Sequence, residues 1–119
     1  MLSHTNRVLN VIYDLKACIR QGVYSDYNRL LDEYIDYAQE AALMANTSSE
    51  KVRILIDCAY LLLDTAKDHR VANHWRQQCI DKIYRPLLTA QRYALVTEDD
   101  RYIRMFQYQY TRLLPQFFN

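Results

Sequence analysis

Hydrophobic residues recur every three or four positions along almost the whole chain, a period typical of helices that bury one face. The first predicted helix covers residues 5–21 and ends before Gly22, because glycine commonly terminates a helix in a left-handed conformation. A second helix is predicted over residues 25–45, with Ser25 as its N-cap. The positions predicted to face inward are Val8, Val11, Ile12, Leu15, Cys18 and Ile19 in the first helix, and Tyr27, Leu30, Leu31, Tyr34, Ala38 and Ala41 in the second.

The third predicted helix follows a polar break at residues 46–49 and runs to about Asp68. Thr47 and Glu50 have the spacing of a capping box, in which the two side chains satisfy backbone amides at the start of a helix. The helix's own hydrophobic side chains lie around most of its circumference, a pattern typical of a helix at the centre of a bundle. Its polar residues fall in one narrow arc, made of Glu50, Arg53, Asp57, Asp64 and Asp68.

Two further helices complete the prediction. The fourth begins near Arg70, and Pro86 should kink or split it near residues 84–85, because proline lacks an amide hydrogen and clashes with the preceding turn. The fifth begins at Thr97, where acidic residues suit the positive end of a helix, and it ends before Pro115. The chain is therefore predicted to be one all-α domain, a bundle of four to five helices with a central, mostly buried third helix.

Tyrosine is unusually frequent, with eleven residues in 119, whereas glycine occurs once and proline twice. The scarcity of glycine and proline favours helix, but tyrosine is a mediocre helix former, so its abundance must serve packing or contact with a partner. The predicted helix faces place Tyr27, Tyr34, Tyr102 and Tyr110 inward and Tyr13 and Tyr108 outward among cations, and leave Tyr24, Tyr37, Tyr60, Tyr84 and Tyr93 unassigned.

The net charge of the chain is close to zero, at +1, but the charged residues are distributed unevenly along it. Residues 1–65 hold six Lys/Arg against nine Asp/Glu, and residues 66–119 hold nine against five. The two halves could attract each other within the fold or across a dimer, or the basic half could bind an acidic partner. The near-neutral total argues against general nucleic-acid binding, although a local basic patch stays possible.

The location of the protein is predicted from its cysteines and its apolar runs. Three cysteines, Cys18, Cys58 and Cys79, are widely spaced and favour buried free thiols in a reducing compartment. The longest apolar run, residues 58–63, is far too short to cross a membrane, and the N-terminal segment is amphipathic, unlike a signal peptide. We therefore expect a cytoplasmic protein that does not enter a membrane.

No constellation of residues in the sequence predicts catalysis. His69 and His74 are five residues apart and do not share a helix face, so the usual helical metal motifs are missing. Asp64, Asp68 and His69 could hold a cation only with help from another helix, and a glycine-rich phosphate loop needs more than one glycine. The prediction is accordingly a non-enzymatic protein with no catalytic residue, metal or cofactor.

Two acidic arcs admit two interpretations each. The arc on the second helix is either an ordinary solvated side or a docking surface for a basic partner. The arc on the third helix is either a binding site or an internal contact covered by Lys or Arg of the fourth or fifth helix, and we favour the internal contact. The arc on the second helix consists of Asp32, Glu33, Asp36 and Glu40.

The residue pattern of the last predicted helix gives the most specific indication of function. One face is predicted to be core, and the other gathers three arginines around Tyr108. Arginine and tyrosine are the residues most enriched at protein-interface hot spots, and the same pattern also suits stacked bases and phosphates. The other interpretation is an ordinary solvated helix face. The chain is predicted to be a protein-binding adaptor, chaperone or stoichiometric inhibitor; a nucleic-acid-binding regulator and a homodimeric or larger homo-oligomeric structural protein stay as alternatives. The predicted partner-binding residues are Arg101, Arg104, Tyr108, Arg112, Phe117 and Phe118.

Overall fold

The computed structural model describes residues 4–22, 29–97 and 100–117 and confirms the all-α prediction. Several predicted features lie outside the described residues: Tyr24, Ser25, Tyr27, Glu98, Asp99 and Phe118, together with the side chains of Val8 and Thr97. The helices are α1 (His4–Gln21), α2 (Leu30–Met44), α3 (Ser48–Lys67), α4 (Asn73–Lys82), α5 (Tyr84–Thr97) and α6 (Arg101–Leu113), and α6 continues into the 3₁₀ helix η1 (Leu114–Phe117).

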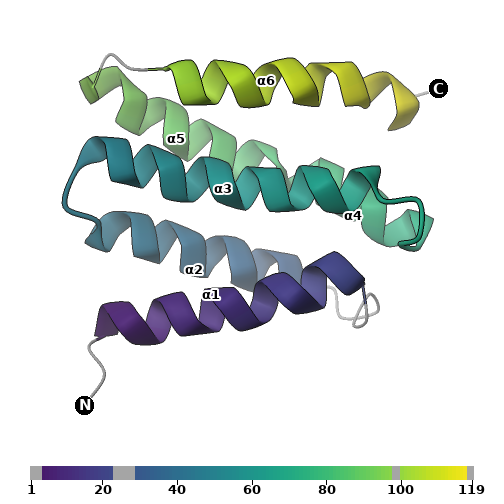
Figure 1. Cartoon of the computed structure of the whole chain (residues 1–119), viewed down its shortest axis with the longest axis horizontal. Helices are drawn as coiled ribbons and strands as arrows, with labels where there is room; N and C mark the ends of the chain where they lie inside the picture. Colours follow the sequence, from purple (N-terminus) through teal and green to yellow (C-terminus); the bar gives the residue numbers. More distant parts are fainter. Residues whose placement is uncertain (1–3, 23–28, 98–99, 118–119) are drawn as a thin grey trace.

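The helices pack in two layers, which gives a slab with Cα extents of 40 × 36 × 17 Å. In Figure 1, α1, α3 and α6 lie in the nearer layer and α2, α4 and α5 lie behind them. The central helix is α3, as predicted, because it contacts each of the other five α-helices. It buries nine residues, Val52, Leu55, Ile56, Cys58, Ala59, Leu62, Leu63, Thr65 and Ala66, which explains why its hydrophobic residues extend around most of its circumference.

The ends of α1 and α3 follow from local chemistry that the sequence predicted. Gly22 ends α1 with φ of 64°, and its amide donates to the carbonyl oxygens of Cys18 and Ile19, both at 3.1 Å. Thr47 caps α3, since its Oγ1 accepts from the Glu50 amide at 3.1 Å. The Glu50 carboxylate in turn accepts from the Asn46 amide at 3.3 Å, one residue earlier than in the standard capping box. Both predicted helix boundaries are therefore confirmed.

Two predicted helix starts are wrong by several residues, and a third cannot be compared. The second helix, α2, begins at Leu30 in the structure, and its predicted start at Ser25 lies outside the described residues. The fourth begins at Asn73 rather than near Arg70, because the Asp68 carboxylate and carbonyl bond the amides of residues 70 and 71 and hold a turn there. The last begins at Arg101 rather than Thr97, since α5 continues through Thr97 and the carbonyl of Asp100 accepts the first helical bond from the Arg104 amide at 2.9 Å.

The predicted break near Pro86 is present and falls at Ile83, between α4 and α5. Pro86 lies in the first turn of α5, where a helix has no intrahelical acceptor for an amide hydrogen. If α4 and α5 are counted as one broken helix, the described part of the chain has the five helices that the sequence predicted.

A buried junction joins α1, α3 and α4. Trp75 is fully buried and its indole Nε1 donates to the carbonyl oxygen of Ile19 at 2.9 Å. Arg76, also buried, donates from Nε to the carbonyl oxygen of Ala66 at 2.7 Å. A Cβ added to Gly22 would lie 3.1 Å from Val71 and 3.3 Å from Trp75, so the close approach of these elements favours glycine there. We call Ile19, Arg20, Gly22, Asp68, Trp75 and Arg76 the α1–α3–α4 junction.

The acidic arc of α2 forms ion pairs inside the molecule. Asp32 accepts from Lys82 at 3.0 Å and from Arg85 at 3.1 Å, and Asp36 accepts from Arg85 at 2.6 Å. Lys82 and Arg85 belong to the basic half of the sequence, so at this contact the two halves attract each other within the fold. These carboxylates thus hold α2 against the α4–α5 break, a role that neither predicted interpretation of the arc included.

Candidate functional site

The last helix packs beside α3 in the same direction, so that the two N-terminal ends meet and the two C-terminal ends meet (Figure 1). An aromatic cluster joins them. The Tyr60 ring lies 5.1 Å from the Phe106 ring in an edge-to-face contact and 6.1 Å from the Tyr102 ring, and Phe106 stacks on Tyr110 at 5.7 Å. Phe106 and Leu113 are buried and Tyr102 and Tyr110 are partly buried, which confirms the predicted inner face of the helix.

The opposite face of α6 is exposed along its whole length. Tyr108 keeps 64% of its surface exposed, and the Arg104 side chain keeps 65%. Arg104 pairs with Asp100 at 3.0 Å, within its own helix end. Arg112 donates from Nη1 to the Tyr108 hydroxyl at 3.2 Å, and its guanidinium lies 5.5 Å from the centre of that ring. This contact holds the tyrosine and the arginine together as one exposed cationic and aromatic surface.

Two pockets open between α3 and α6 and connect this surface to the polar arc of α3. The first, of about 310 Å³, is lined by Ser49, Val52, Arg53, Arg101, Tyr102 and Met105. The second, of about 280 Å³, is lined by Lys67, Tyr108, Gln109, Arg112, Leu113 and Gln116. We call the surface that includes both pockets the α3–α6 face; it comprises Arg53, Asp57, Tyr60, Asp64 and Lys67 of α3 with Arg101, Tyr102, Met105, Tyr108 and Arg112 of α6.

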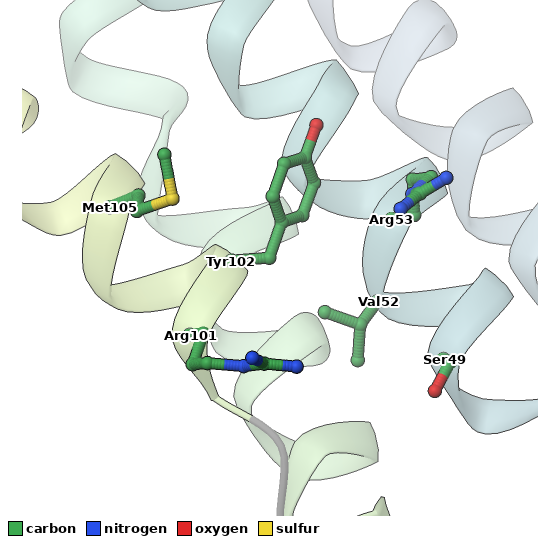
Figure 2. A pocket seen from close by; sticks show the side chains of 6 residues that line it. All are labelled: Ser49, Val52, Arg53, Arg101, Tyr102 and Met105. Carbon is green, nitrogen blue, oxygen red and sulfur yellow. The ribbon is translucent and has the colours of Figure 1, made fainter.

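Figure 2 shows the first pocket, where Arg101 extends from α6 toward Val52 and Ser49 of α3 and Tyr102 stands between Met105 and Arg53. The guanidinium of Arg53 lies 5.8 Å from the centre of the Tyr102 ring. The Tyr102 hydroxyl donates to the Asp57 carboxylate. Burial and this hydrogen bond raise the pKa of Tyr102 to about 12, so the phenol stays neutral and keeps donating at physiological pH.

The polar arc of α3 is divided between two environments. Asp57 contacts Tyr102 of the last helix, while Asp64 lies exposed near Tyr60, where the two aspartates add to burial in raising the pKa of the Tyr60 phenol. Asp68 instead accepts from Arg70 at 2.9 Å and from Arg20 of α1 at 3.3 Å. One of these cations, Arg70, stands at the predicted start of the fourth helix, although the structure places it in the turn before α4; the other, Arg20 of α1, was not expected.

The aromatic tail lies apart from the arginine stripe. Phe117 packs against the hydrophobic core, and the Arg76 guanidinium lies 5.5 Å from the centre of its ring. Phe118 lies outside the described residues. Of the six predicted partner-binding residues, the structure thus gathers four along the exposed side of α6 and places Phe117 at its end, against α4.

Two features of the surface escaped the sequence analysis. Arg53 and Lys67 join the α6 stripe, although nothing local in the sequence relates residues about 45 positions apart along the chain. On α5, Tyr84, Leu88 and Leu95 are exposed, Leu95 to 81%, and Leu95 borders a pocket of about 320 Å³ between α5 and α6. The spacing of these three residues, four and seven positions apart, is the signal that could have identified them as one helix face.

The tyrosines assigned to exposed positions are placed as predicted, and so are two of the cysteines. Tyr13 and Tyr108 are both exposed, and Tyr34 is fully buried. Burial raises the pKa of the Cys58 and Cys79 thiols to about 12, so neither is a reactive thiolate at neutral pH. Cys18 is only half-buried.

The described residues also bear on metal binding and on membrane insertion. Among the residues that the structure describes, no group of three His, Cys, Asp or Glu side chains is placed to hold a metal ion. Within the same residues, no helix combines the length and apolarity that crossing a membrane requires.

Comparison of the chain with models of protein families, with curated proteins and with solved structures finds no significant match. The interpretation of the α3–α6 face therefore depends on its own geometry and chemistry.

Proposed function

We propose that this protein is a non-enzymatic protein-binding module of the adaptor, chaperone or stoichiometric inhibitor type, and that the exposed side of α6 is its contact surface. One observation carries the proposal: Arg101, Arg104, Tyr108 and Arg112 form a continuous exposed stripe with a pocket at each end. Exposed tyrosine and arginine combine large contact area with polar tips, which is why they dominate interface hot spots. We expect the protein to act in a reducing compartment such as the cytoplasm, because Cys58 and Cys79 are buried free thiols.

Site-specific photo-crosslinking in the cells that produce the protein tests this surface. A benzophenone amino acid placed at Tyr108 should capture a partner protein, and the same group placed at Tyr13, a still more exposed tyrosine on α1, is the matched control. Combining Arg104→Glu and Tyr108→Ala should abolish recovery of that partner in a pull-down while the circular dichroism spectrum stays unchanged. Full recovery of the partner by the folded double variant, or crosslinking only from position 13, would contradict the proposal that α6 is the contact surface.

A nucleic-acid-binding regulator is the second candidate, since arginines flanking a tyrosine can also hold phosphates and stack bases. This alternative predicts binding to DNA or RNA that weakens steeply with added salt. Absence of binding at low salt would dispose of it.

A homo-oligomer is the third candidate, and the exposed face of α5 now favours it more than the tyrosines do. Leu88 and Leu95 present apolar surface on one side of α5, of the kind that a second copy can bury. Light scattering that shows a monomer at high concentration would end this alternative.

A further inference from the structure

We infer that the α3–α6 face binds an amphipathic helix of a protein partner that carries an acidic residue near each end and a basic residue between them. This inference rests on the proposed function and names the chemistry of its partner. The order of charges within the face supplies the argument, because its exposed cations lie at the two ends and its exposed carboxylates, Asp57 and Asp64, lie between them. Glu50 lies beyond the Arg53 end and accepts from the backbone amide of Asn46 at the start of α3.

Each end of the face combines cations from both helices. At one end, Arg53 of α3 and Arg101 of α6 line the first pocket, together with Ser49 of α3. At the other end, Lys67 of α3 and Arg112 of α6 line the second pocket. Two guanidinium groups at one end, and a guanidinium and an ammonium at the other, each match a single carboxylate.

The middle of the face has the opposite sign. Asp57 and Asp64 of α3 are exposed between Arg53 and Lys67, on the same side of the helix. A nucleic-acid strand carries a negative charge at every nucleotide and would be repelled by this middle section. A peptide can place a lysine or arginine there, so the alternation of sign favours a peptide over a nucleic acid.

The dimensions of the face suit a helix. Arg53 and Lys67 are fourteen residues apart on one straight α-helix, which corresponds to about 21 Å. A partner helix that lies parallel to α3 therefore needs its two acidic residues at the same separation of fourteen. Each pocket also has an apolar side, Val52 and Met105 in one and Leu113 in the other, where an apolar residue of the partner helix can pack. The described residues include no strand, so they offer no strand edge to which an extended peptide could pair.

The experiment titrates the ¹⁵N-labelled full chain with designed helical peptides of about 18 residues and follows the amide signals by NMR. The test peptide has a glutamate at each end, fourteen residues apart, a central lysine and an apolar stripe on the same face. The matched peptide has the same composition, with the lysine at one end and a glutamate at the centre. We expect the test peptide to bind about fivefold to tenfold more tightly at low salt, and to shift signals at both ends of the face.

Two protein variants assign that preference to the face. Arg53→Glu combined with Arg101→Glu should remove the preference between the two peptides. Arg7→Glu combined with Arg92→Glu makes the same change in net charge at exposed arginines of α1 and α5 and should keep the preference. Both variants are checked for an unchanged helical spectrum and unfolding midpoint before the titration.

Three results would overturn the inference. They are equal affinity for the two peptides, a preference that survives the double substitution in the face, and tighter binding of a single-stranded oligonucleotide than of the test peptide. The first two leave the proposed function intact if a partner still crosslinks from position 108, so a failure of the partner's charge pattern is distinguishable from a failure of α6 as the contact surface.

Discussion

The α1–α3–α4 junction and the α3–α6 face both contain arginines beside α3, and they use them in opposite ways. In the junction, Arg76 is buried and bonded to a backbone carbonyl, and Arg20 reaches the Asp68 carboxylate on α3. On the exposed side of α6, Arg112 of the face and the neighbouring Arg104 contact residues of their own helix and remain exposed. Arginine bonded across elements stabilises the fold, whereas arginine left at the surface adds little stability and remains accessible to a partner.

The largest expected effect of breaking the junction is that of Trp75→Ala. The substitution removes a fully buried ring and its hydrogen bond to Ile19, so the free energy of unfolding should fall by about 3 to 5 kcal/mol. Urea unfolding followed by circular dichroism measures it. Tyr108→Ala on the face is the matched aromatic control and should stay within about 0.5 kcal/mol of the parent. Similar losses in the two variants would contradict the comparison.

The second effect is a pH-dependent loss of stability in Asp68→Asn. Hydrogen bonds from Arg70 and Arg20 hold the pKa of the Asp68 carboxyl well below its usual range. A depressed pKa stabilises the fold above the unfolded-state pKa of about 4, and this stabilisation is lost as the pH falls through the folded-state pKa. The urea midpoint of the variant should therefore be lower than that of the parent at pH 7, with the difference shrinking in strong acid. The exposed Asp64→Asn substitution on the same helix is the control, and a constant difference across the pH range would exclude this role for Asp68.

A smaller loss of stability is expected from Tyr102→Phe, a substitution at the base of the α3–α6 face. Loss of the hydroxyl that donates to Asp57 should lower the free energy of unfolding by about 0.5 to 1.5 kcal/mol at neutral pH. Because the pKa of Tyr102 is raised to about 12, this contribution is complete below the unfolded-state pKa of about 10 and declines as the pH rises toward 12. Unfolding of both proteins between pH 8 and 11 tests the sign, and a growing difference at high pH would contradict it.

The smallest effect on stability should come from the double variant with Arg104→Glu and Tyr108→Ala. Both side chains are mainly exposed, and the Asp100–Arg104 pair lies within a single helix end. Exposed pairs of this kind contribute about 0.2 to 1 kcal/mol, so the unfolding midpoint should scarcely move. A loss as large as that of Trp75→Ala would mean that the stripe serves the fold rather than a partner.

The predictions that succeeded from sequence were those that depend on nearby residues. Gly22 ends a helix, Thr47 begins one and Pro86 accompanies a break, because each acts within about one helical turn. Thr97 shows the limit of the same reasoning. It has the chemistry of an N-cap, but α5 continues through it and the last helix begins only at Arg101.

The relations that sequence reasoning missed connect residues far apart in the chain. The indole of Trp75 bonds Ile19 across 56 residues, and Arg85 pairs with Asp32 across 53. The same limit applies to the site. The stripe on α6 could be found from its helical spacing, whereas its alignment with Arg53 and Lys67 depends on the direction in which α6 packs on α3, which no local pattern specifies.

The parallel direction of α3 and α6 has a consequence for the order of folding. Two helices that run the same way need a connection that returns the chain to its starting side, and here α4 and α5 provide it (Figure 1). Arg53 and Arg101, which meet in the first pocket, are 48 residues apart in the sequence. Closing a loop of this length costs conformational entropy, so contacts of this kind form more slowly than local ones. On the ribosome, the face can assemble only after α6 has emerged, so a partner that recognises it can bind only once α3, α4, α5 and α6 have all been synthesised.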